Sequence, residues 1–229
     1  MCGPMTPEVA IEFRKDQPVL RAMSQRVRQR LAANPAVWRA PTEKAELYAV
    51  ADFASPEECA RLMAMIDEVA RPSTVFDMTY ADGYRTSFSG DVDPHDPFVK
   101  KIERRLDDLL GAEQEWGETV QGQRYAPGQQ FKAHHDWFHP NTSYWERETE
   151  KGGQRAWTAM IYLNNVEAGG TTDFPELNMS VEPKQGVLLL WNNVDEDGIP
   201  NRATLHAGTP VVSGVKYVAT KWYRAKPWR

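Results

Sequence analysis

The sequence predicts a mainly β fold with flanking helices (α+β), in which an antiparallel sandwich is buttressed by helices near the N-terminus. Two observations lead to this class. Three amphipathic helical segments lie in the first half of the chain and end by Gly111. After about Glu118, short segments of strand character follow one another, separated by turn residues. Helices followed by a run of strands, without βαβ alternation, favour a layered antiparallel fold.

The first helix lies in residues 1–45, which we expect to form an N-terminal helical appendage to a main domain at residues 46–229. Asp16 is a candidate cap with proline in the first turn, and Pro35 ends the segment. One face is apolar (Leu20, Met23, Val27, Leu31) and the other is basic (Arg21, Arg26, Arg28, Arg30). We expect the helix to pack on the main domain with its basic face solvated. A docking surface for a partner or second protomer is the alternative.

The next two helices carry clear start signals. Ser55-Pro56-x-Glu58 is a capping box with proline at the first helical position, and it follows a predicted strand, LYAVADF. Asp96-Pro97 begins a third helix that ends at Gly111. The later segments predicted as strands are TVQGQRYA, QFKAHHDW, RAWTAMIYLNNV, MSVEP, GVLLLWNN, ATLHAG and KYVATKWYR.

Composition limits the partners and the compartment. The net charge of −5 and pI of about 5.6 favour neither nucleic acid nor anionic membranes as partners. The two cysteines, Cys2 and Cys59, indicate neither a disulfide framework nor a zinc site. The chain shows no signal-peptide pattern and no apolar run of membrane-spanning length, so we expect a cytoplasmic protein. No oligomeric state is predicted.

His134-x-Asp136 and the distant His206 form a candidate metal-binding set. Residues i and i+2 of a strand point to the same side, so His134 and Asp136 can share one ion while His135 points away. The third ligand must come from another strand: GVLLLW is predicted as a core strand, residues 195–201 as a turn, and ATLHAG as the return strand that delivers His206. Two imidazoles and one carboxylate are the ligands of non-haem iron(II) sites with open coordination positions. Alone, His-x-Asp would more simply be a surface turn.

Lys216 lies ten residues after the second histidine. A lysine at this place could hold the far carboxylate of a dicarboxylic co-substrate through a charge-assisted hydrogen bond. Together with the iron ligands it indicates oxidation by O2, with 2-oxoglutarate supplying the other two electrons. An exposed strand lysine is the simpler alternative.

Four ordered blocks surround these residues: YAPGQQFKAHHDWF, GGQRAWTAMIYLNNVEAGGTTDFP, VEPKQGVLLLWNN and LHAGTPVVSGVKYVATKW. With DFASPEEC and RTSFSG upstream, they resemble the catalytic domain of the prolyl 4-hydroxylase family of Fe(II)/2-oxoglutarate-dependent dioxygenases, over residues 47–222. The resemblance implies a double-stranded β-helix (jelly-roll) core that binds Fe(II), O2 and 2-oxoglutarate. It also implies succinate and CO2 as products and ascorbate as a reductant.

The resemblance assigns the iron and co-substrate contacts residue by residue. The iron ligands would be His134, Asp136 and His206. Lys216 would pair with the C5 carboxylate of 2-oxoglutarate, and Tyr125 and Thr172 would donate hydrogen bonds to it.

On the substrate side, Arg155 matches a family arginine that contacts the peptide, and Trp222 matches an aromatic residue of the active-site wall. Arg224 stands where some relatives place a substrate-contacting histidine. Two further departures from the family pattern are Phe131, where some relatives have tyrosine, and Thr171, where an acid is usual. Residues 138–153 are expected to form a mobile loop over the pocket mouth.

The function that the resemblance implies is hydroxylation of a C–H bond, most simply at C4 of a peptidyl proline. The expected partner is therefore a peptide or protein that contains proline. Asp136 favours hydroxylation over halogenation, because related halogenases lack the carboxylate ligand. A hydroxylase of a free amino acid or other small metabolite is the alternative on the same fold. A binding module without activity is disfavoured by the intact ligand set and Lys216.

Overall fold

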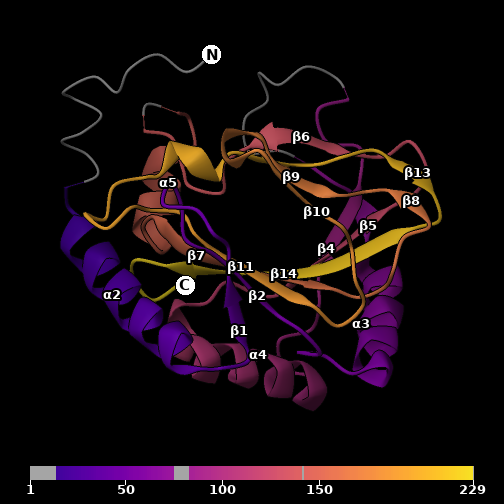
Figure 1. The fold of residues 1–229 in the computed structure, drawn as a ribbon, viewed down its shortest axis with the longest axis horizontal. Coiled ribbons are helices and arrows are strands. Elements are labelled where there is room, and N and C mark those ends of the chain that lie inside the picture. Colours follow the sequence, from indigo (N-terminus) through magenta and orange to yellow (C-terminus); the bar gives the residue numbers. More distant parts are fainter. Residues whose placement is uncertain (1–13, 75–82, 141, 229) are drawn as a thin grey trace.

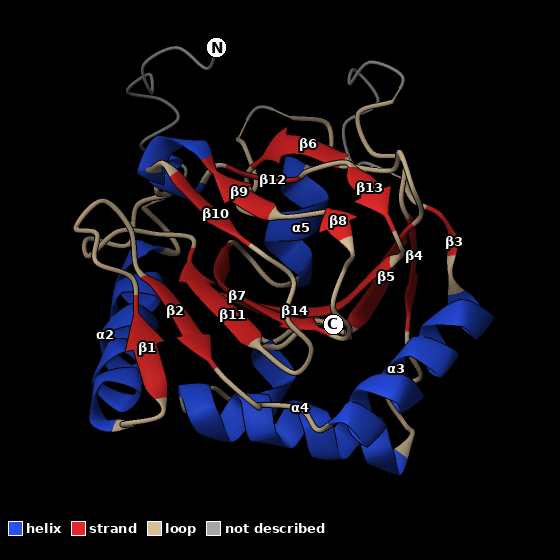
Figure 2. Ribbon diagram, turned by 45° about the vertical axis from the view of Figure 1, so that its right-hand side comes forward, coloured by secondary structure: helices blue, strands red, loops and turns tan. Residues whose placement is uncertain are grey.

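Two antiparallel sheets lie one above the other in the computed structural model, which describes residues 14–74, 83–140 and 142–228. The smaller sheet lies above the larger one in Figure 1, and helices cover the outer side of the larger sheet (Figure 2). The predicted class, mainly β with flanking helices, is confirmed. Each of the seven strand segments predicted after Glu118 contains a strand.

The larger sheet has eight strands in the order β1 (Val37–Arg39), β2 (Leu47–Val50), β11 (Leu188–Asn192), β7 (Arg155–Tyr162), β14 (Lys216–Arg224), β5 (Gln121–Tyr125), β4 (Phe88–Asp91) and β3 (Arg71–Pro72). The smaller sheet has the order β10 (Met179–Val181), β9 (Thr172–Phe174), β12 (His206–Gly208) and β6 (Phe131–His134). A short pair, β8 (Ala168–Gly169) and β13 (Val211–Ser213), completes the strands of the described residues.

The chain crosses between the two sheets after β11. β11 pairs with β2 and β7 in the larger sheet, whereas β12 pairs with β6 and β9 in the smaller one. The turn predicted at 195–201 therefore carries the chain to the opposite sheet and does not fold it back beside β11. The predicted strand ATLHAG begins with a 3-10 turn, Arg202–Thr204, and only its second half is β12.

Two of the helices begin and end where their sequence signals predict. α3 (Pro56–Val69) has the capping box: the Glu58 N–H donates to Ser55 Oγ, and the Ser55 N–H donates to the Glu58 carboxylate. α4 (Pro97–Leu110) is capped by Asp96 and ends at Gly111, whose φ of 65° lies in the left-handed region that favours glycine. The fourth helix of the described residues, α5 (Trp145–Lys151), was not predicted.

The N-terminal helix, α2 (Gln17–Ala33), is part of the main core. Its predicted apolar face is at most 1% exposed (Leu20, Met23, Val27, Leu31), and it packs in one cluster with α4 and β7. Two arginines of the basic face also reach the main domain, because Arg28 pairs with Glu46 and Arg30 donates to the carbonyl of Asp108. The described part of residues 1–45 is thus joined to the main core and is not a separate body. Residues 1–13 lie outside the described residues.

Alternation along β14 gives the larger sheet two different faces. Lys216, Thr220 and Trp222 line the cavity between the sheets. Lys221 and Tyr223 point to the other side, where they bind Glu103 and Asp107 of α4. No helix in the described residues is both long and apolar enough to cross a membrane.

Candidate active site

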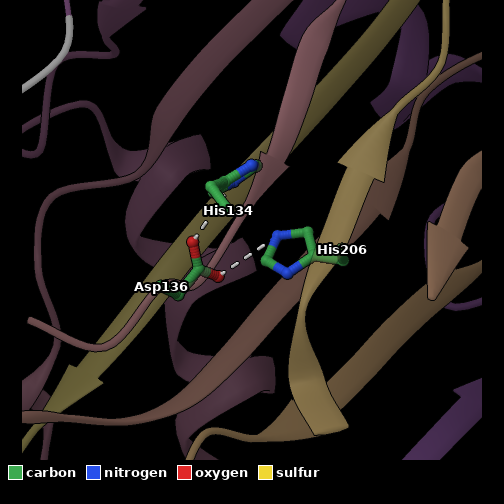
Figure 3. Close-up of side chains that lie close together, drawn as sticks. All are labelled: His134, Asp136 and His206. Atoms are coloured by element: carbon green, nitrogen blue, oxygen red, sulfur yellow. Dashed lines mark ion pairs between the residues drawn. The ribbon is translucent and has the colours of Figure 1, made fainter. Parts of the chain in front are cut away.

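The three predicted metal ligands meet at the junction of β6 and β12. His134 is the last residue of β6, and it lies directly across the strand pair from His206, the first residue of β12. Asp136 follows two residues after the end of β6. The ligand atoms of the three side chains all lie within 4.8 Å of one another. Figure 3 shows the Asp136 carboxylate facing both imidazoles, with Oδ1 3.8 Å from His134 Nε2 and Oδ2 3.9 Å from His206 Nε2.

Hydrogen bonds to the main chain orient both imidazoles. His134 Nδ1 lies 2.8 Å from the carbonyl oxygen of Lys132, and His206 Nδ1 lies 2.9 Å from that of Thr204. Each carbonyl can only accept, so Nδ1 carries the proton in both rings, and Nε2 keeps its lone pair for a metal. Phe131 stacks on the His134 ring, with 3.5 Å between centroids, and holds it from the other side.

Burial sets the charges that a metal requires. It lowers the pKa of His134 well below its ordinary value, and the neighbouring His206 lowers it further. Burial alone would raise the pKa of Asp136, but the two histidines and the Arg155 guanidinium outweigh it, so the pKa of Asp136 lies below its ordinary value. At neutral pH the site therefore offers a neutral imidazole at His134 and an ionised carboxylate, which are the forms that bind a metal ion.

His135 points away from the three ligands, as the strand alternation predicts. Its Nε2 lies 3.1 Å from the carbonyl oxygen of Arg202, and burial lowers its pKa to about 4. It is not part of the metal-binding group found among the described residues.

The predicted co-substrate contacts gather in the wall of the same cavity as the metal ligands. Lys216 of β14 and Tyr125 of β5 are paired across the sheet, and Lys216 Nζ donates to Thr172 Oγ1 at 3.3 Å. Lys216 is only 2% exposed and has no salt bridge to a carboxylate among the described residues. Burial lowers its pKa to about 7. A buried ammonium group beside hydroxyls fits a carboxylate of a bound dicarboxylic acid.

Two neighbours of this group were not predicted. The Tyr125 hydroxyl donates to Gln123 Oε1 at 2.7 Å, and the Tyr162 hydroxyl donates to Thr172 Oγ1 at 2.8 Å. Gln123 is a buried polar residue at an inward position of β5, two residues from Tyr125. Strand alternation from Tyr125 is the signal that would have indicated it.

On the substrate side, the structure brings Arg155 and Trp222 together. The Arg155 guanidinium lies 3.9 Å from the centroid of the Trp222 ring, and both residues line the cavity. Arg155 donates to both carboxylate oxygens of Glu118, at 2.6 and 2.7 Å. The role of Glu118 was not predicted, because nothing in the sequence around an acidic residue before a strand indicates that it is buried against an arginine. Arg155 is therefore held in place before any substrate arrives.

Arg224 is placed differently from the prediction. It is fully buried and does not line the cavity. It donates to Glu118, and it binds the carboxylate and the carbonyl oxygen of Glu148 in α5. The predicted contact with a substrate needs an accessible side chain. Arg224 instead links β14 to α5 at a place that is separated from the cavity. The strand register aims it at these acids rather than at the cavity.

The segment 138–153, which we expected to be a loop, contains a helix. α5 occupies residues 145–151, and its Glu148 is buried against Arg224. Helix residues and the preceding Tyr144 form part of the cavity wall. Position 141 lies outside the described residues.

The cavity that joins these groups has a volume of about 1460 Å³. Its lining includes the three metal ligands, the Lys216 group, Arg155 and Trp222. One continuous space thus connects a metal-binding set, a buried cation and an aromatic wall.

Comparison with known proteins gives matches of one kind, to 2OG-Fe(II) oxygenases and prolyl 4-hydroxylases. Residues 120–224 match the 2OG-Fe(II) oxygenase superfamily. Prolyl 4-hydroxylase 2 of Arabidopsis thaliana is 31% identical over 82% of this chain and 70% of its own length. Prolyl 4-hydroxylase 1 of the same plant is 34% identical over 76% of this chain and 67% of its own length.

Solved structures show the same fold. The viral collagen prolyl hydroxylase of Paramecium Bursaria Chlorella virus-1, solved as a 2OG complex, has a TM-score of 0.62 and 28% identity, and the match covers 78% of this chain and 95% of that one. A Trichoplax adhaerens prolyl hydroxylase, solved with a peptide fragment of hypoxia inducible factor, has a TM-score of 0.57 and covers 90% of each chain. At 16% identity the second match shows the fold alone. The jelly-roll core expected from the sequence is confirmed.

Proposed function

The chain belongs to the prolyl 4-hydroxylase family of 2OG-Fe(II) oxygenases, and on that premise we propose that it hydroxylates C4 of a proline residue within a peptide or protein. It is an Fe(II)- and 2-oxoglutarate-dependent dioxygenase. The observation that carries the proposal is the continuous cavity, which is lined by the metal-binding set, the buried Lys216, Arg155 and Trp222.

The residues present fit the iron and the co-substrate of this family. His134, Asp136 and His206 would hold Fe(II) on one face, because their free ligand atoms converge. Lys216 would hold the far carboxylate of 2-oxoglutarate, with Thr172 as a hydroxyl donor. Tyr125 would join it by turning its hydroxyl proton from Gln123 Oε1 to the carboxylate. When bound, iron and 2-oxoglutarate supply the oxidation of the C–H bond by O2, with succinate and CO2 as co-products. Ascorbate as the reductant is part of the proposal, and stimulation of turnover by ascorbate tests it.

Arg155 and Trp222 would position the substrate. The guanidinium is fixed by Glu118 and stacked on the indole, and its remaining N–H groups have no hydrogen-bond acceptor among the described residues, so they could donate to a carbonyl oxygen of an extended peptide. A proline ring packs well against an indole face. These contacts place the substrate without taking part in the oxidation.

A free amino acid or small metabolite is the second candidate substrate. The cavity volume of about 1460 Å³ exceeds what a single amino acid and a five-carbon dicarboxylate fill, and ordinary small-molecule pockets are about 300–1,000 Å³. A single amino acid would leave much of the aromatic wall in water. The size of the cavity therefore favours a peptide.

The test is succinate formation with proline-containing peptides and with free L-proline, each with hydroxyproline detected in the product. We expect peptides to be turned over and free proline to be poor. Arg155→Ala should reduce peptide hydroxylation more than the uncoupled decay of 2-oxoglutarate, since Arg155 is not one of the three metal ligands and acts on Asp136 only through its charge. Efficient hydroxylation of free proline with inert peptides would instead establish the small-metabolite alternative.

A further inference from the structure

Thr158 is the one hydroxyl residue in an otherwise apolar stretch of β7, Ala156–Ile161. It is fully buried at the centre of the larger sheet, where it lies opposite Trp191 of β11 and Trp222 of β14. Its hydroxyl donates to Asp136 Oδ2 at 2.7 Å. A buried hydroxyl is thus directed at one oxygen of the proposed carboxylate ligand.

The direction of this hydrogen bond is set by Asn193, which follows β11 and is also fully buried. Asn193 Nδ2 donates to Thr158 Oγ1 at 2.9 Å. A hydroxyl has a single proton, so Thr158 accepts from the amide and gives its proton to Asp136. Backbone hydrogen bonds fix Asn193 itself, because its N–H donates to Ala156 and its carbonyl accepts from Asn201.

The two oxygens of Asp136 are thereby made different. Oδ2 lies 3.9 Å from His206 Nε2 and Oδ1 lies 3.8 Å from His134 Nε2, but only Oδ2 accepts a hydrogen bond from a side chain of the described residues, that of Thr158. A carboxylate that bound a metal through both oxygens would take up one of the positions that a three-ligand site leaves open. Because the Thr158 hydrogen bond occupies Oδ2, this oxygen is disfavoured as a second metal ligand. Those positions then remain for the co-substrate and O2.

We infer that Asn193 and Thr158 are positioning residues, which hold Asp136 as a ligand through Oδ1 alone. The inference rests on the proposed function, since it concerns the same metal site. It goes beyond it in assigning roles to two residues that touch neither the metal nor a substrate. The hydrogen bonds to His134 Nδ1 and His206 Nδ1 act on the other two ligands in the same way.

The test is the affinity of the full chain for Mn(II), a stand-in that does not react with O2, measured by calorimetry without 2-oxoglutarate. Loss of an outer hydrogen bond of this kind weakens metal binding by about 10–100-fold, and we expect this for Thr158→Val. Thr158→Ser keeps the hydroxyl and should rescue binding. Asn193→Leu should weaken it less than the valine variant does, because the hydroxyl remains but is no longer directed.

The matched control is Tyr223→Phe, which removes another buried hydroxyl from a carboxylate, Asp107, at the same 2.7 Å but on the far side of the sheet. It should lower the thermal unfolding midpoint and leave Mn(II) affinity unchanged. A role of Thr158 in stability alone would make Thr158→Val resemble this control. If Thr158→Val does not fold, Asn193→Leu and Thr158→Ser carry the comparison.

The outcomes separate the two claims. If the wild-type chain binds no Mn(II) or Fe(II), the proposed function fails and the positioning role fails with it. If the wild type binds metal and both Thr158→Val and Asn193→Leu bind it equally well, only the positioning role is overturned. Weak binding by Thr158→Val with rescue by serine supports it.

Discussion

At the scale of single residues, Lys216 links co-substrate binding to pH. Burial lowers its pKa to about 7, so the lysine changes between its charged and neutral forms near neutral pH. A carboxylate needs the charged form, so 2-oxoglutarate binding takes up a proton above that pH. We expect the affinity to be constant below about pH 6 and to fall above pH 7, by up to about tenfold per pH unit.

Calorimetry with Mn(II)-loaded protein between pH 6 and 9, in buffers of different ionisation enthalpy, measures both the affinity and the proton uptake. The same shift has a stability consequence. The pKa of Lys216 is lower in the folded than in the unfolded chain, so the unfolded chain binds more protons between about pH 7 and 10.5. This residue therefore disfavours folding at low pH, and the penalty disappears as the pH rises through that window. A pH-independent affinity would show that Lys216 is not the group that holds the dicarboxylate.

The metal ligands make a second prediction at this scale. His134→Ala, Asp136→Ala and His206→Ala should each abolish 2-oxoglutarate consumption, because two remaining ligands cannot fix an ion on one face. The fold should survive, since the core clusters do not include these side chains. Iron content, 2-oxoglutarate consumption and thermal unfolding are measured for each variant. Wild-type activity in Asp136→Ala would remove the metal assignment.

At the scale of elements, Arg224 fastens α5 to the larger sheet. It contacts two buried carboxylates, those of Glu118 and Glu148. Replacing it by methionine leaves Glu148 without its buried cation, and breaking a buried ion pair costs about 3–5 kcal/mol. We expect Arg224→Met to lower the free energy of unfolding by about that amount and to speed hydrogen exchange in α5. Peptide KM should rise while uncoupled 2-oxoglutarate decay persists.

Arg147→Met is the control for this change. Arg147 pairs with the same carboxylate at 3.2 Å, but its side chain is 64% exposed, and exposed pairs contribute about 0–1 kcal/mol. Urea unfolding of the two variants compares them directly. Equal destabilisation would mean that the buried contacts of Arg224 do not anchor α5.

The elements also show what the sequence could predict. The starts of α3 and α4 were predicted correctly because Ser55 and Asp96 cap amides two or three residues away. The ligand set was predicted because the sequence blocks around His134, Asp136 and His206 resemble the family, although β6 ends at His134 and Asp136 lies two residues beyond it. Glu148 was not connected with Arg224, which lies 76 residues further along the chain. A buried arginine requires an acidic partner, but the sequence does not identify which one. The register of β14 and the position of α5 decide which acid lies near Arg224.

The same limit applies to residues inside strands. Thr158 interrupts an apolar stretch, which predicts a buried hydroxyl with a partner but does not identify it. Strands β4 and β9 were missed because they are short and hold polar residues, with a glycine as well in β4, so their pairing depends on distant neighbours.

At the scale of the whole molecule, α2 contributes to the stability of the main domain. Leu20 and Leu31 are buried in the same cluster as Trp157 of β7. Replacing a buried leucine by alanine typically costs 2–5 kcal/mol, so we expect Leu20→Ala and Leu31→Ala each to lower the free energy of unfolding by about that amount. Each variant should unfold in a single transition, and the lower free energy of unfolding should be seen in that transition. A separate, earlier transition confined to α2 would show instead that the helix unfolds independently of the main domain.

The start of α2 also reaches the cavity wall through a chain of hydrogen bonds. Asp16 does not cap its own helix, and its carboxylate accepts instead from the Gln154 N–H at 3.0 Å. The Gln154 side chain in turn binds Phe138, accepting from its N–H at 2.7 Å and donating to its carbonyl at 2.9 Å. Gln154 directly precedes Arg155, and the centroid of the Phe138 ring lies 4.9 Å from the Arg155 guanidinium. The N-terminal helix thus fixes the wall on which a peptide would lie.

We therefore expect Asp16→Ala to raise the KM for peptide substrates several-fold, with Mn(II) and 2-oxoglutarate affinities unchanged, because Lys216 and the metal ligands make no contact with Asp16. Losing a hydrogen bond to a charged acceptor is worth about 1.5–3 kcal/mol, so unfolding should also become easier. Lys226→Met is the control: it removes the other partner of Asp16, a side chain that is 46% exposed, without touching Gln154. Steady-state kinetics with peptide and co-substrate varied separately distinguish the effects. If Asp16→Ala changed 2-oxoglutarate binding as much as peptide binding, the hydrogen-bond chain through Gln154 would not be the route by which α2 acts on the site.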